Sequence, residues 1–572
     1  MTGFRLGPDD RAESLTRLVS EELDVLVVGG GVVGAGAALD AATRGLTVGL
    51  LEMRDWASGT SSRSSRLAHG GLRYLEQLEF GLVREALAER GLLLERLAPH
   101  LVRPVPFLLP LTHRGWERPY LGAGVALYDA LSRISRQGTT LRGHRHLSRT
   151  SVQRLAPALD PETVVGAIGF HDAQIDDVRH TLAVVRTAAS RGAVVASRVE
   201  VTGLLCRDSP AGDGPVIGVS AHDHDSGQVL AIHAKVVLAA TGVWSDQVDS
   251  WLGRATAAPV VPSIGVHLVV PRSAIDLRTA VIARTPSSVL FLLPWGQHWL
   301  VGTTDTPWDG ERSEPRATAA DVQYLLDQAN RWLTRPLTRG DIVGVYAGLR
   351  PLVASEVADA DSAETTKLSR EHLVTAPTPG LVSVAGGKYT TYRVMAADAV
   401  DAVAAQLPDP VPVSRTEHVP LAGALGYRQL WQDRHRLATQ SGLTVESVEH
   451  LLGRHGVLAR ELLDMVAARP ELGQVIHPEA PYLAAEIVHA ATHEDARHLD
   501  DILVRRTRLA LETRDGARTV AAAAASLVAP ILRWDAATAA AEVAAFCSAG
   551  YGQVPAPEPP QDPDPPVPTD RS

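Results

Sequence analysis

The stretch SSRLAHGGLRYLEQ, residues 64–77, gathers side chains that could take part in a reaction. His69 is of a type that exchanges protons near neutral pH, and Arg73 is of a type that binds anions. Tyr74 adds a hydroxyl group, and the Gly70–Gly71 pair interrupts any regular element. The stretch closely follows a glycine-rich run that is typical of nucleotide binding, which indicates a polar loop beside a cofactor site.

The glycine-rich run at residues 24–52 has the spacing of a dinucleotide-binding motif. The apolar residues 25–28 predict a buried strand that turns through Gly29-x-Gly31-x-x-Gly34 into a helix. Gly29 fits a tight turn, Gly31 lets the backbone approach a pyrophosphate, and Gly34 lets the helix pack closely on the strand. The run therefore predicts a strand-turn-helix unit that holds the phosphates of a dinucleotide.

The next strand of this unit supports the same interpretation. The helix N-terminus favours a pyrophosphate because its free N–H groups and its dipole attract anions. The second strand ends on Glu52, 18 residues after Gly34, where a carboxylate can accept hydrogen bonds from ribose hydroxyls. FAD and NAD share this motif, so the motif alone leaves the cofactor open.

The composition is that of a large globular protein with 572 residues, 45% of them hydrophobic, and a formal net charge of −10. A pI near 6.1 lacks the basic character of nucleic-acid binders, so we expect no nucleic-acid partner. The two cysteines, Cys206 and Cys547, lie far apart, which argues against a disulfide scaffold and a thiolate zinc site. The histidines of HEDARH, residues 493–498, are spaced wrongly for a zinc helix, and we expect no metal site.

The chain divides into regions of different composition. β-Branched runs alternate with alanine-rich helical stretches up to about residue 400, which is typical of an α/β fold. After a linker at residues 406–423, residues 424–550 consist mostly of helix-forming residues and predict an all-helical C-terminal domain. We expect residues 1–20 to be a flexible leader and the proline-rich residues 551–572 to be disordered, since neither can bury enough apolar surface.

Two later segments favour FAD. Residues 234–248 predict a strand that ends in Ala-Thr-Gly, and residues 380–400 predict a strand, a Gly-Gly turn and a helix. With the N-terminal motif they resemble the discontinuous Rossmann-like FAD-binding domain of the two-dinucleotide-binding-domain flavoproteins. Within an oxidoreductase region at residues 21–405, we expect the FAD-binding domain at about 21–100, 160–255 and 340–405, and an antiparallel-sheet substrate or cap domain at about 101–159 and 256–339.

Over about residues 20–550 the chain resembles the aerobic, FAD-dependent glycerol-3-phosphate dehydrogenase family. The blocks that carry the resemblance are VVGGGVVGAGAALDAATRGLTVGLLE, TSSRSSRLAHGGLRYLEQLEFGLVREALAER, LPWGQHWLVGTTD, YAGLRPL, GGKYTTYRVMA and LDDILVRRTR. Family members usually carry lysine in S-S-K-L, where this chain has Arg66. The charge is kept, but a compact ammonium becomes a planar fork, so the role of Arg66 stays open.

The resemblance implies which residues bind cofactor and substrate. It implies noncovalent contacts with FAD for Gly29, Gly31, Gly34, Glu52, Thr60, Ser61, Ser64, Ser65, Thr241, Gly242, Gly387 and Lys388. It implies a substrate site lined by Arg73, Tyr74, His267, Arg350, Arg370, Lys388 and Thr391. Several cations around one small phosphate dianion are consistent with this, because charge-assisted hydrogen bonds are the strong ones.

The residue that accepts the proton of the substrate hydroxyl is less well defined. Arg350 is expected beside that hydroxyl, but a guanidinium with a pKa above about 12 is a poor base, so we assign it to stabilising the alkoxide. His69 is the preferred base and His267 the alternative, since clustered cations keep a histidine neutral and able to accept a proton. A substrate-assisted or water-assisted route also stays open.

The resemblance implies oxidation of sn-glycerol 3-phosphate to dihydroxyacetone phosphate, with hydride transfer to flavin N5 and electrons passed to a membrane quinone. The alternatives are a glycerol-3-phosphate oxidase that uses oxygen and a D-amino-acid or 2-hydroxyacid oxidase of the same fold. A non-catalytic flavin-binding platform is a further alternative, although a platform has no need of a phosphate clamp. The sequence is compatible with a homodimer.

A basic amphipathic segment at residues 113–136 is the candidate membrane contact. It combines apolar residues at helical spacing with several arginines and with Trp116 and Tyr120, a pattern that suits a membrane interface. The alternative is a helix whose apolar stripe packs on its own domain. Without a signal-peptide core or a membrane-spanning apolar run, we expect a cytoplasmic protein that associates peripherally with the inner face of the cytoplasmic membrane.

Overall fold

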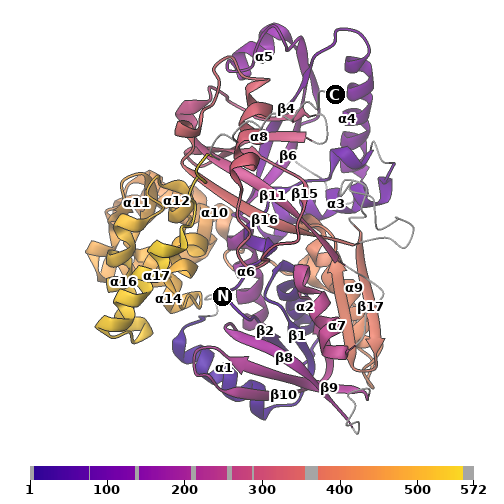
Figure 1. The fold of residues 1–572 in the computed structure, drawn as a ribbon, viewed down its shortest axis with the longest axis vertical. Coiled ribbons are helices and arrows are strands. Elements are labelled where there is room, and N and C mark those ends of the chain that lie inside the picture. Colours follow the sequence, from indigo (N-terminus) through magenta and orange to yellow (C-terminus); the bar gives the residue numbers. More distant parts are fainter. Residues whose placement is uncertain are drawn as a thin grey trace, which may run out of the picture.

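The computed structural model has three parts: a nucleotide-binding unit at the bottom of Figure 1, a cap domain above it and a C-terminal domain at the side. Within the described ranges, every helix is too short or too polar to cross a lipid bilayer. The described residues are 5–75, 78–134, 141–207, 214–253, 260–285, 289–353 and 371–557.

A largely parallel sheet forms the centre of the nucleotide-binding unit. Its strands are β1 (Leu23–Val28), β2 (Val48–Leu51), β7 (Val194–Ala196), β8 (Val199–Cys206), β9 (Val216–Asp223), β10 (Val229–Ala239), β17 (His372–Thr378) and β18 (Leu381–Gly386). The parallel strands follow the order β18-β10-β1-β2-β7, and β17 pairs antiparallel with β18 at one edge. β8, β9 and β10 form an antiparallel ribbon.

Both faces of this sheet are buried, which explains the continuous apolar run of β1. The helices of the unit are α1 (Pro8–Ser20), α2 (Val32–Thr43), α6 (Asp177–Ser190), α7 (Asp246–Leu252) and α9 (Tyr392–Ala404). Val25 and Val27 pack in the core that α2, α6 and α9 share. Leu26 and Val28 pack in a second core with α1 and the antiparallel ribbon. Parallel strands that are covered on both sides read as unbroken apolar sequence, as here.

The N-terminal segment corrects our expectation of a flexible leader. Residues 8–20 form α1, in which Leu18 is fully buried and Leu15 packs beside it. Arg11 makes a buried ion pair with Asp223 of β9, with an N–O distance of 2.5 Å. The segment is polar overall, but its leucines fall on one side of a short helix, and that stripe is enough to hold it on the sheet.

The cap domain is a ten-stranded sheet with helices on both faces. Its strands are β3 (Leu67–Ala68), β4 (Val102–Leu111), β5 (Arg145–Ser148), β6 (Gly166–Ile175), β11 (Val260–Pro271), β12 (Ala280–Arg284), β13 (Val289–Trp295), β14 (His298–Gly302), β15 (Thr306–Pro307) and β16 (Gly344–Val353). Its strand pairs are antiparallel except β4 with β12, which run parallel. The associated helices are α3 (Phe80–Leu92), α4 (Glu117–Ile134), α5 (Arg149–Leu155) and α8 (Ala319–Asn330).

The cap sheet is larger than we expected. We assigned the segments of β6 and β16 to the FAD-binding domain, but β6 pairs with β4 and β16 pairs with β11 along their full lengths. Strand pairing between distant segments has no local signature, so the sequence did not reveal which sheet these two strands join.

The C-terminal domain is mainly helical. Its helices are α10 (Tyr427–Gln432), α11 (Arg434–Ser441), α12 (Val445–His455), α13 (Ala459–Ala468), α14 (Ala484–His493), α15 (Leu509–Glu512), α16 (Arg518–Leu532) and α17 (Ala536–Ala549). It also contains a small hairpin, β19 (Val475–His477) with β20 (Ala480–Leu483), which corrects the expected all-helical domain. Short strands of three and four residues in a helix-rich sequence carry too little periodicity to be recognised.

The linker and the start of the proline-rich tail both pack against folded domains. In the linker, Val419 and Leu421 are buried in the core of the nucleotide-binding unit. Of the proline-rich tail, residues 551–557 are described and lie against the cap domain, where the Gly552 carbonyl accepts a hydrogen bond from the backbone N–H of Val345 at 3.1 Å. Residues 558–572 lie outside the described part.

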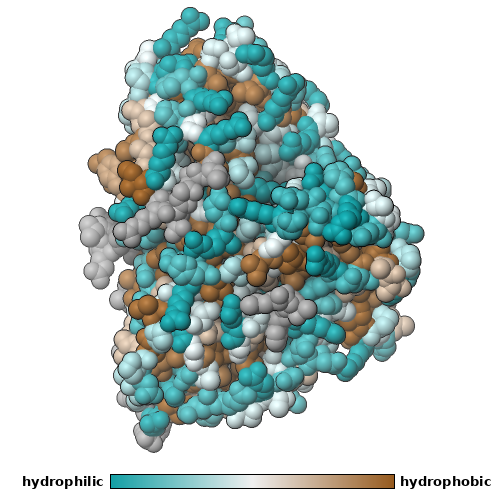
Figure 2. Space-filling model, turned by 180° about the vertical axis from the view of Figure 1, so that it is seen from behind, coloured by the Kyte–Doolittle hydropathy of each residue, from teal (hydrophilic) through white to brown (hydrophobic). Residues whose placement is uncertain are grey.

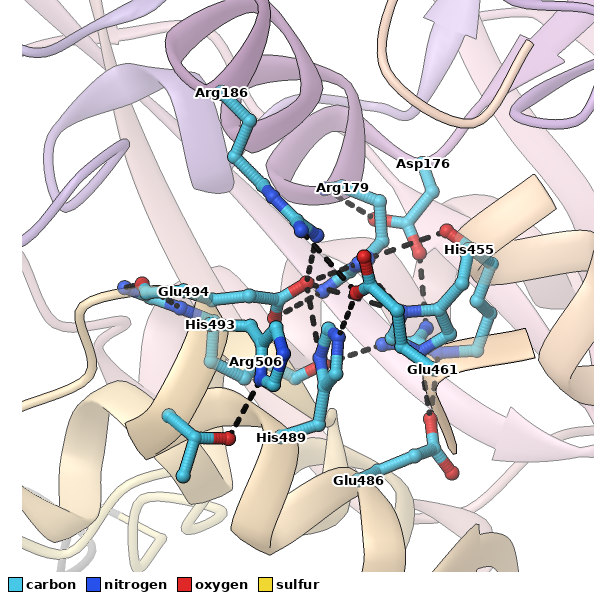
Figure 3. A network of polar contacts seen from close by, with 12 residues as sticks. Asp176, Arg179, Arg186, His455, Glu461, Glu486, His489, His493, Glu494 and Arg506 are labelled. Carbon is cyan, nitrogen blue, oxygen red and sulfur yellow. Dashed lines mark hydrogen bonds and ion pairs between the residues drawn. The ribbon is translucent and has the colours of Figure 1, made fainter. Parts of the chain in front are cut away.

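A buried network of charges joins α6 to the C-terminal domain (Figure 3). Arg179 donates two hydrogen bonds of 2.6 Å to Glu494, and its guanidinium lies 2.9 Å from Nδ1 of His455. Arg186 lies 3.7 Å from the same carboxylate. Burial opposes the ionisation of Glu494, but Arg179 and His489 lower its pKa well below the usual range. The carboxylate is therefore charged in the folded protein and depends on its partners.

We expect Arg179→Met to lower the free energy of unfolding by about 3 to 5 kcal/mol, because it removes the main partner of a buried carboxylate. Urea unfolding followed by circular dichroism measures the change. The matched control is Arg17→Met. Arg17 pairs with Glu21 at the surface, where the two side chains are 43% and 42% exposed. Loss of this exposed ion pair should lower the free energy of unfolding by about 1 kcal/mol or less. Similar small effects in both variants would contradict the role of Arg179.

Candidate functional site

The glycines of the nucleotide motif bring three backbone segments into close contact. Gly29 has φ +114°, and a Cβ there would lie 2.5 Å from the Ala240 carbonyl oxygen. A Cβ at Gly34 would lie 1.9 Å from the carbonyl oxygen of Gly29, so helix and turn approach as the motif predicts. At Gly31, which precedes the first residue of α2, a Cβ would meet only the Ser61 hydroxyl, at 3.2 Å. The turn is therefore closely packed against backbone at Gly29 and Gly34, and it is open at Gly31, where α2 begins.

A cavity lies in front of this turn, at the carboxyl ends of β1, β2 and β10. Its volume is about 1140 Å³, including the space at its opening to solvent. Of the expected cofactor contacts, the cavity wall contains Gly29, Gly31, Glu52, Thr60, Ser61, Thr241, Gly242, Gly387 and Lys388. These residues come from four separate segments of the chain, and the fold brings them around one space.

Glu52 is buried in the wall of the cavity. Its carboxylate accepts hydrogen bonds from the backbone N–H groups of Gly30 at 2.7 Å and Arg54 at 2.8 Å. Burial raises the pKa of Glu52, while these N–H groups and the charge of Arg54 act in the opposite direction. Each carboxylate oxygen keeps a further lone pair that a ribose hydroxyl can use.

Two hydroxyl residues of the loop after β2 border the same cavity. The Ser61 hydroxyl accepts a hydrogen bond from the Val32 N–H in the first turn of α2, at 2.9 Å. The Thr60 hydroxyl donates to the carbonyl of Leu349 on β16, at 2.7 Å. The loop therefore ties the start of α2 to the cap strand that carries Arg350.

Ser64 and Ser65, which we expected to contact the cofactor, bind protein groups and are not part of the described cavity wall. The Ser64 hydroxyl and N–H both donate to Asp177 at the start of α6, at 2.7 and 3.1 Å. The Ser65 hydroxyl lies 2.9 Å from Nε2 of His267. Serines in a polar loop look alike in sequence, and their partners come from segments more than a hundred residues away.

The C-terminal domain holds this loop with buried arginines. Arg506 donates hydrogen bonds of 2.7 and 2.6 Å to the two carboxylate oxygens of Asp55, and Arg505 contacts the same carboxylate. Arg508 donates to Asp177 at 2.5 Å, the residue that holds Ser64. Sequence reasoning did not predict these contacts, although the arginines belong to the block LDDILVRRTR that carries part of the family resemblance.

Sequence reasoning also missed part of the apolar wall. Trp244 and Trp251 line the cavity after β10, and Met53 follows Glu52. The Arg54 guanidinium lies over the ring of Trp244, 5.1 Å from its centroid. The two tryptophans stand seven residues apart after the Ala-Thr-Gly turn, a spacing that puts them on one side of a helical segment and could have indicated them.

The substrate side of the site lies on two paired cap strands. In the antiparallel register, His267 of β11 faces Tyr346 of β16, and Ser263 faces Arg350. Residues four apart on a strand point to the same face of a sheet, so these side chains share one face. Pro351 of β16 also lines the cavity, which places the Arg350 strand at its border.

Arg350 is held by a set of hydrogen bonds. Its guanidinium donates to Asp305, to the Thr303 hydroxyl and to the Thr304 carbonyl, each at 3.0 Å. Asp305, which sequence reasoning missed, forms the ion pair, and the Arg350 side chain is 23% exposed. The planar fork is thus fixed in orientation by one loop after β14.

His267 is buried and neutral. Its ring stacks on Tyr346 with centroids 4.8 Å apart and an angle of 7° between the planes. Burial, then Arg350, then Arg66 lower the pKa of His267 to about 3. Its Nδ1 atom has no hydrogen-bond partner among the residues that the structure describes. A neutral imidazole with a free ring nitrogen can accept a proton.

The polar loop that opened the sequence analysis lies beside the Gly386–Lys388 turn. The His69 N–H donates to the Thr390 hydroxyl at 3.2 Å. The buried Tyr74 ring lies under the ammonium of Lys388, whose Nζ is 3.4 Å from the ring centroid. Thr391 is buried at the start of α9, with its hydroxyl 3.4 Å from the Lys388 carbonyl. The Arg73 side chain and Arg370 lie outside the described part of the structure.

One group of side chains has the composition of a metal site. His455, His489 and Glu494 bring potential ligand atoms within 4.8 Å of one another. Arg179 contacts two of the three, so guanidinium groups already compensate the carboxylate there (Figure 3). We interpret the group as part of the ion-pair network between the domains.

Comparison with protein families gives two matches. The model described as FAD dependent oxidoreductase matches residues 24–393. The model described as the C-terminal domain of alpha-glycerophosphate oxidase matches residues 414–539.

Individual relatives cover nearly the whole chain. A glycerol-3-phosphate dehydrogenase from Mycobacterium leprae is 50% identical over 541 residues, 95% of this chain and 90% of that protein. The mitochondrial glycerol-3-phosphate dehydrogenase of Homo sapiens is 36% identical and covers 92% of this chain and 73% of its own. Among solved structures, the glycerol-3-phosphate dehydrogenase from Bacillus halodurans complexed with FAD matches with a TM-score of 0.77 and 28% identity, over 95% of this chain and 97% of that one.

We expect Glu52→Ala to weaken FAD retention at least about tenfold, because it removes a charged acceptor that also orders two backbone N–H groups. The measurement is the flavin absorbance that remains after extensive dialysis. The exposed Glu21→Ala is the matched control and should keep its flavin. Equal flavin content in the two variants would show that Glu52 does not contact the cofactor.

Proposed function

The chain belongs to the FAD-dependent glycerol-3-phosphate dehydrogenase family, and we propose that it oxidises sn-glycerol 3-phosphate to dihydroxyacetone phosphate. The identity of 50% over 90% of the Mycobacterium leprae relative supports this activity. The observation that carries the proposal is the placement of Arg350 and His267 on one face of the cap sheet, at the border of the nucleotide cavity.

The cavity fits FAD. The α2 N-terminus opens into it without a capping side chain at Gly31, which suits a pyrophosphate. Glu52 would hold the adenosine ribose, and the Gly386–Gly387 turn would border the flavin. When bound, FAD supplies the acceptor for the hydride.

The side chains of this chain then supply the remaining chemistry. Arg350 stabilises the oxygen of the substrate as its proton leaves, because its partly exposed guanidinium provides a fixed positive charge beside the cavity. His267 accepts the proton: it is neutral, close to Arg350, and has a ring nitrogen available. The negative charges of bound substrate raise the pKa of a nearby imidazole, which strengthens it as a base when it is needed. His69, which the sequence analysis preferred, thereby becomes the alternative base, beside Thr390.

We assign the substrate phosphate to the opposite side of the site. Lys388 and Tyr74 form one pair there, and Arg73, Arg370 and Thr391 complete the set that the family resemblance implies. This cationic set favours a phosphorylated substrate over the amino acids and hydroxyacids of other flavin oxidases. The same set argues against a non-catalytic flavin-binding protein, because such a protein would not need to bind a substrate phosphate.

For the electron acceptor we propose a membrane quinone, reached by docking of α4 on anionic lipid. Leu121, Val125 and Tyr128 of α4 are buried against the cap domain, so one stripe packs internally. A second set is turned outward: Trp116 is 57% exposed and Tyr120 is 54% exposed. Apolar surface is visible along the edge of the cap domain where α4 lies (Figure 2).

Further exposed residues extend this surface. Leu127 and Ile134 lie on α4, and Leu78 and Phe80 lie at the start of α3, which contacts α4. Arg114 and Arg133 are exposed at the two ends of the helix segment. Aromatic and apolar side chains with flanking arginines are the chemistry of an interfacial helix. An oxidase that passes electrons to oxygen would have no need of this surface.

We expect Arg350→Lys to lower kcat/KM for glycerol 3-phosphate at least about tenfold, since lysine keeps the charge but loses the fork that binds three partners. Anaerobic flavin bleaching by glycerol 3-phosphate measures the reaction. The control is Arg312→Lys, at an arginine that pairs with Asp246 near the surface; it should react at the native rate. Native kcat/KM in Arg350→Lys would assign Arg350 to structure alone.

We expect the double substitution Trp116→Ser and Tyr120→Ser to reduce co-sedimentation with anionic liposomes several-fold, because it removes the aromatic side chains that enter the interface. Activity with a soluble dye should stay unchanged, since the flavin site is not touched. Val229→Ser is the matched control: Val229 is 74% exposed but lies on the ribbon of the nucleotide-binding unit. Equal sedimentation of all three proteins would reject α4 as the docking surface.

A further inference from the structure

Arg66 is a buried cation that the proposed reaction does not use directly. Its side chain is 1% exposed, and none of its three guanidinium nitrogens has a hydrogen-bond partner among the described residues. Its φ is +55°, a left-handed conformation that is uncommon for a residue with a side chain. A buried guanidinium without a hydrogen bond, on a left-handed backbone, is energetically unfavourable unless its surroundings compensate for it.

Planar groups surround Arg66. The guanidinium lies over the Trp295 ring, 4.0 Å from its centroid, and over the Tyr346 ring, 5.3 Å from its centroid. Tyr346 also stacks on His267, with centroids 4.8 Å apart. The Tyr346 ring is therefore in contact with both the Arg66 guanidinium and the His267 imidazole.

The neighbouring residue ties the same segment to His267 a second time. The Ser65 hydroxyl lies 2.9 Å from Nε2 of His267, and the Tyr346 hydroxyl donates to the Ser64 carbonyl at 3.0 Å. The loop that carries Arg66 thus fixes both the imidazole and the ring stacked on it.

We propose that Arg66 is a positioning residue that keeps His267 unprotonated and oriented for the oxidation, through its positive charge and through the Tyr346 ring that both side chains contact. The inference rests on the proposed function, in which His267 accepts the substrate proton. It also gives a physical role to the residue at which this chain departs from the S-S-K-L pattern.

The charges around His267 support this role. In the described part of the chain the groups that face it are Arg350 and Tyr346 on β16, Arg66 on the loop before β3, and Asp305, which offsets part of the charge of Arg350. Burial has the largest effect on the pKa of His267, followed by Arg350 and then Arg66, and all three lower it. Asp305 pairs directly with Arg350. Among the described residues Arg66 makes no direct ion pair, although Asp176 is near enough to interact with its charge.

The test compares three variants of the FAD-loaded full chain. Arg66→Met removes the charge with a side chain of similar length, Arg66→Lys keeps the charge, and Trp295→Leu keeps Arg66 but removes one of the two rings that the guanidinium contacts. The rate of flavin reduction by glycerol 3-phosphate is measured anaerobically from pH 3 to 9, a range that includes the pKa of His267, and the melting temperature is recorded for each protein.

We expect the acid limb of the rate profile to move to higher pH by about one unit in Arg66→Met, because loss of the positive charge raises the pKa of His267 and protonates it earlier as pH falls. Arg66→Lys and Trp295→Leu should keep the native limb. Arg66→Met should melt at or above the native temperature, since it removes a buried charge without a hydrogen-bond partner.

Two results would overturn the inference. One is an acid limb that coincides in native protein and Arg66→Met. The other is a drop in melting temperature in Arg66→Met as large as in Trp295→Leu with no change of the limb, which would assign Arg66 to packing. Failure of the native protein to bleach with glycerol 3-phosphate would instead reject the proposed function, so the two failures are distinguishable.

Discussion

The buried arginines at the end of the block LDDILVRRTR fix the loop on which both halves of the site depend. Arg506 holds Asp55 at the start of that loop, and Arg508 holds Asp177, which in turn binds Ser64 near its end. Between Asp55 and Ser64 the loop carries Thr60 and Ser61, which line the nucleotide cavity. The next residue after Ser64 is Ser65, whose hydroxyl contacts His267. Removing one member of a buried ion pair leaves the other charged and desolvated, so these contacts form together or not at all. The C-terminal domain is thereby coupled to the cofactor loop although it contributes no residue to the cavity wall that the structure describes.

The cap sheet imposes the second constraint, which is register. Because β11 and β16 pair over ten positions, the spacing of four between residues 263 and 267 matches that between 346 and 350 on the facing strand. A slip of one residue would turn these side chains to the other face of the sheet. The hydrogen bond from Thr60 to the Leu349 carbonyl then joins this register to the nucleotide-binding unit. The positions of Arg350 and His267 relative to the nucleotide cavity therefore follow from backbone pairing.

The glycine spacing predicted the nucleotide-binding fold, because glycines that need close backbone approach leave a recognisable pattern, while the FAD cofactor and the family were predicted from the later strand-turn segments and the quoted blocks. Gly29 and Gly34 sit where a Cβ would collide with backbone, and no other residue fits. Contacts made by ordinary polar residues were not predictable in the same way. Ser64 and Ser61 stand three residues apart in one loop, yet one binds Asp177 and the other caps α2. Likewise α1 is polar on average and is held by one leucine stripe and one buried ion pair, features that composition does not reveal.

The proposed membrane surface and the substrate strand share one core. Leu121 and Val125 of α4 pack in the same cluster as Tyr346 of β16, together with apolar residues of β4 and β6. Close-packed interiors transmit displacement with little loss, so a load on α4 reaches the ring that stacks on His267. The apolar stripe of α4, which we first considered as an alternative to membrane docking, therefore packs on the cap domain, while Trp116, Tyr120 and the outward residues of the same segment stay exposed. Internal packing and an exposed apolar surface are thus compatible on one helix.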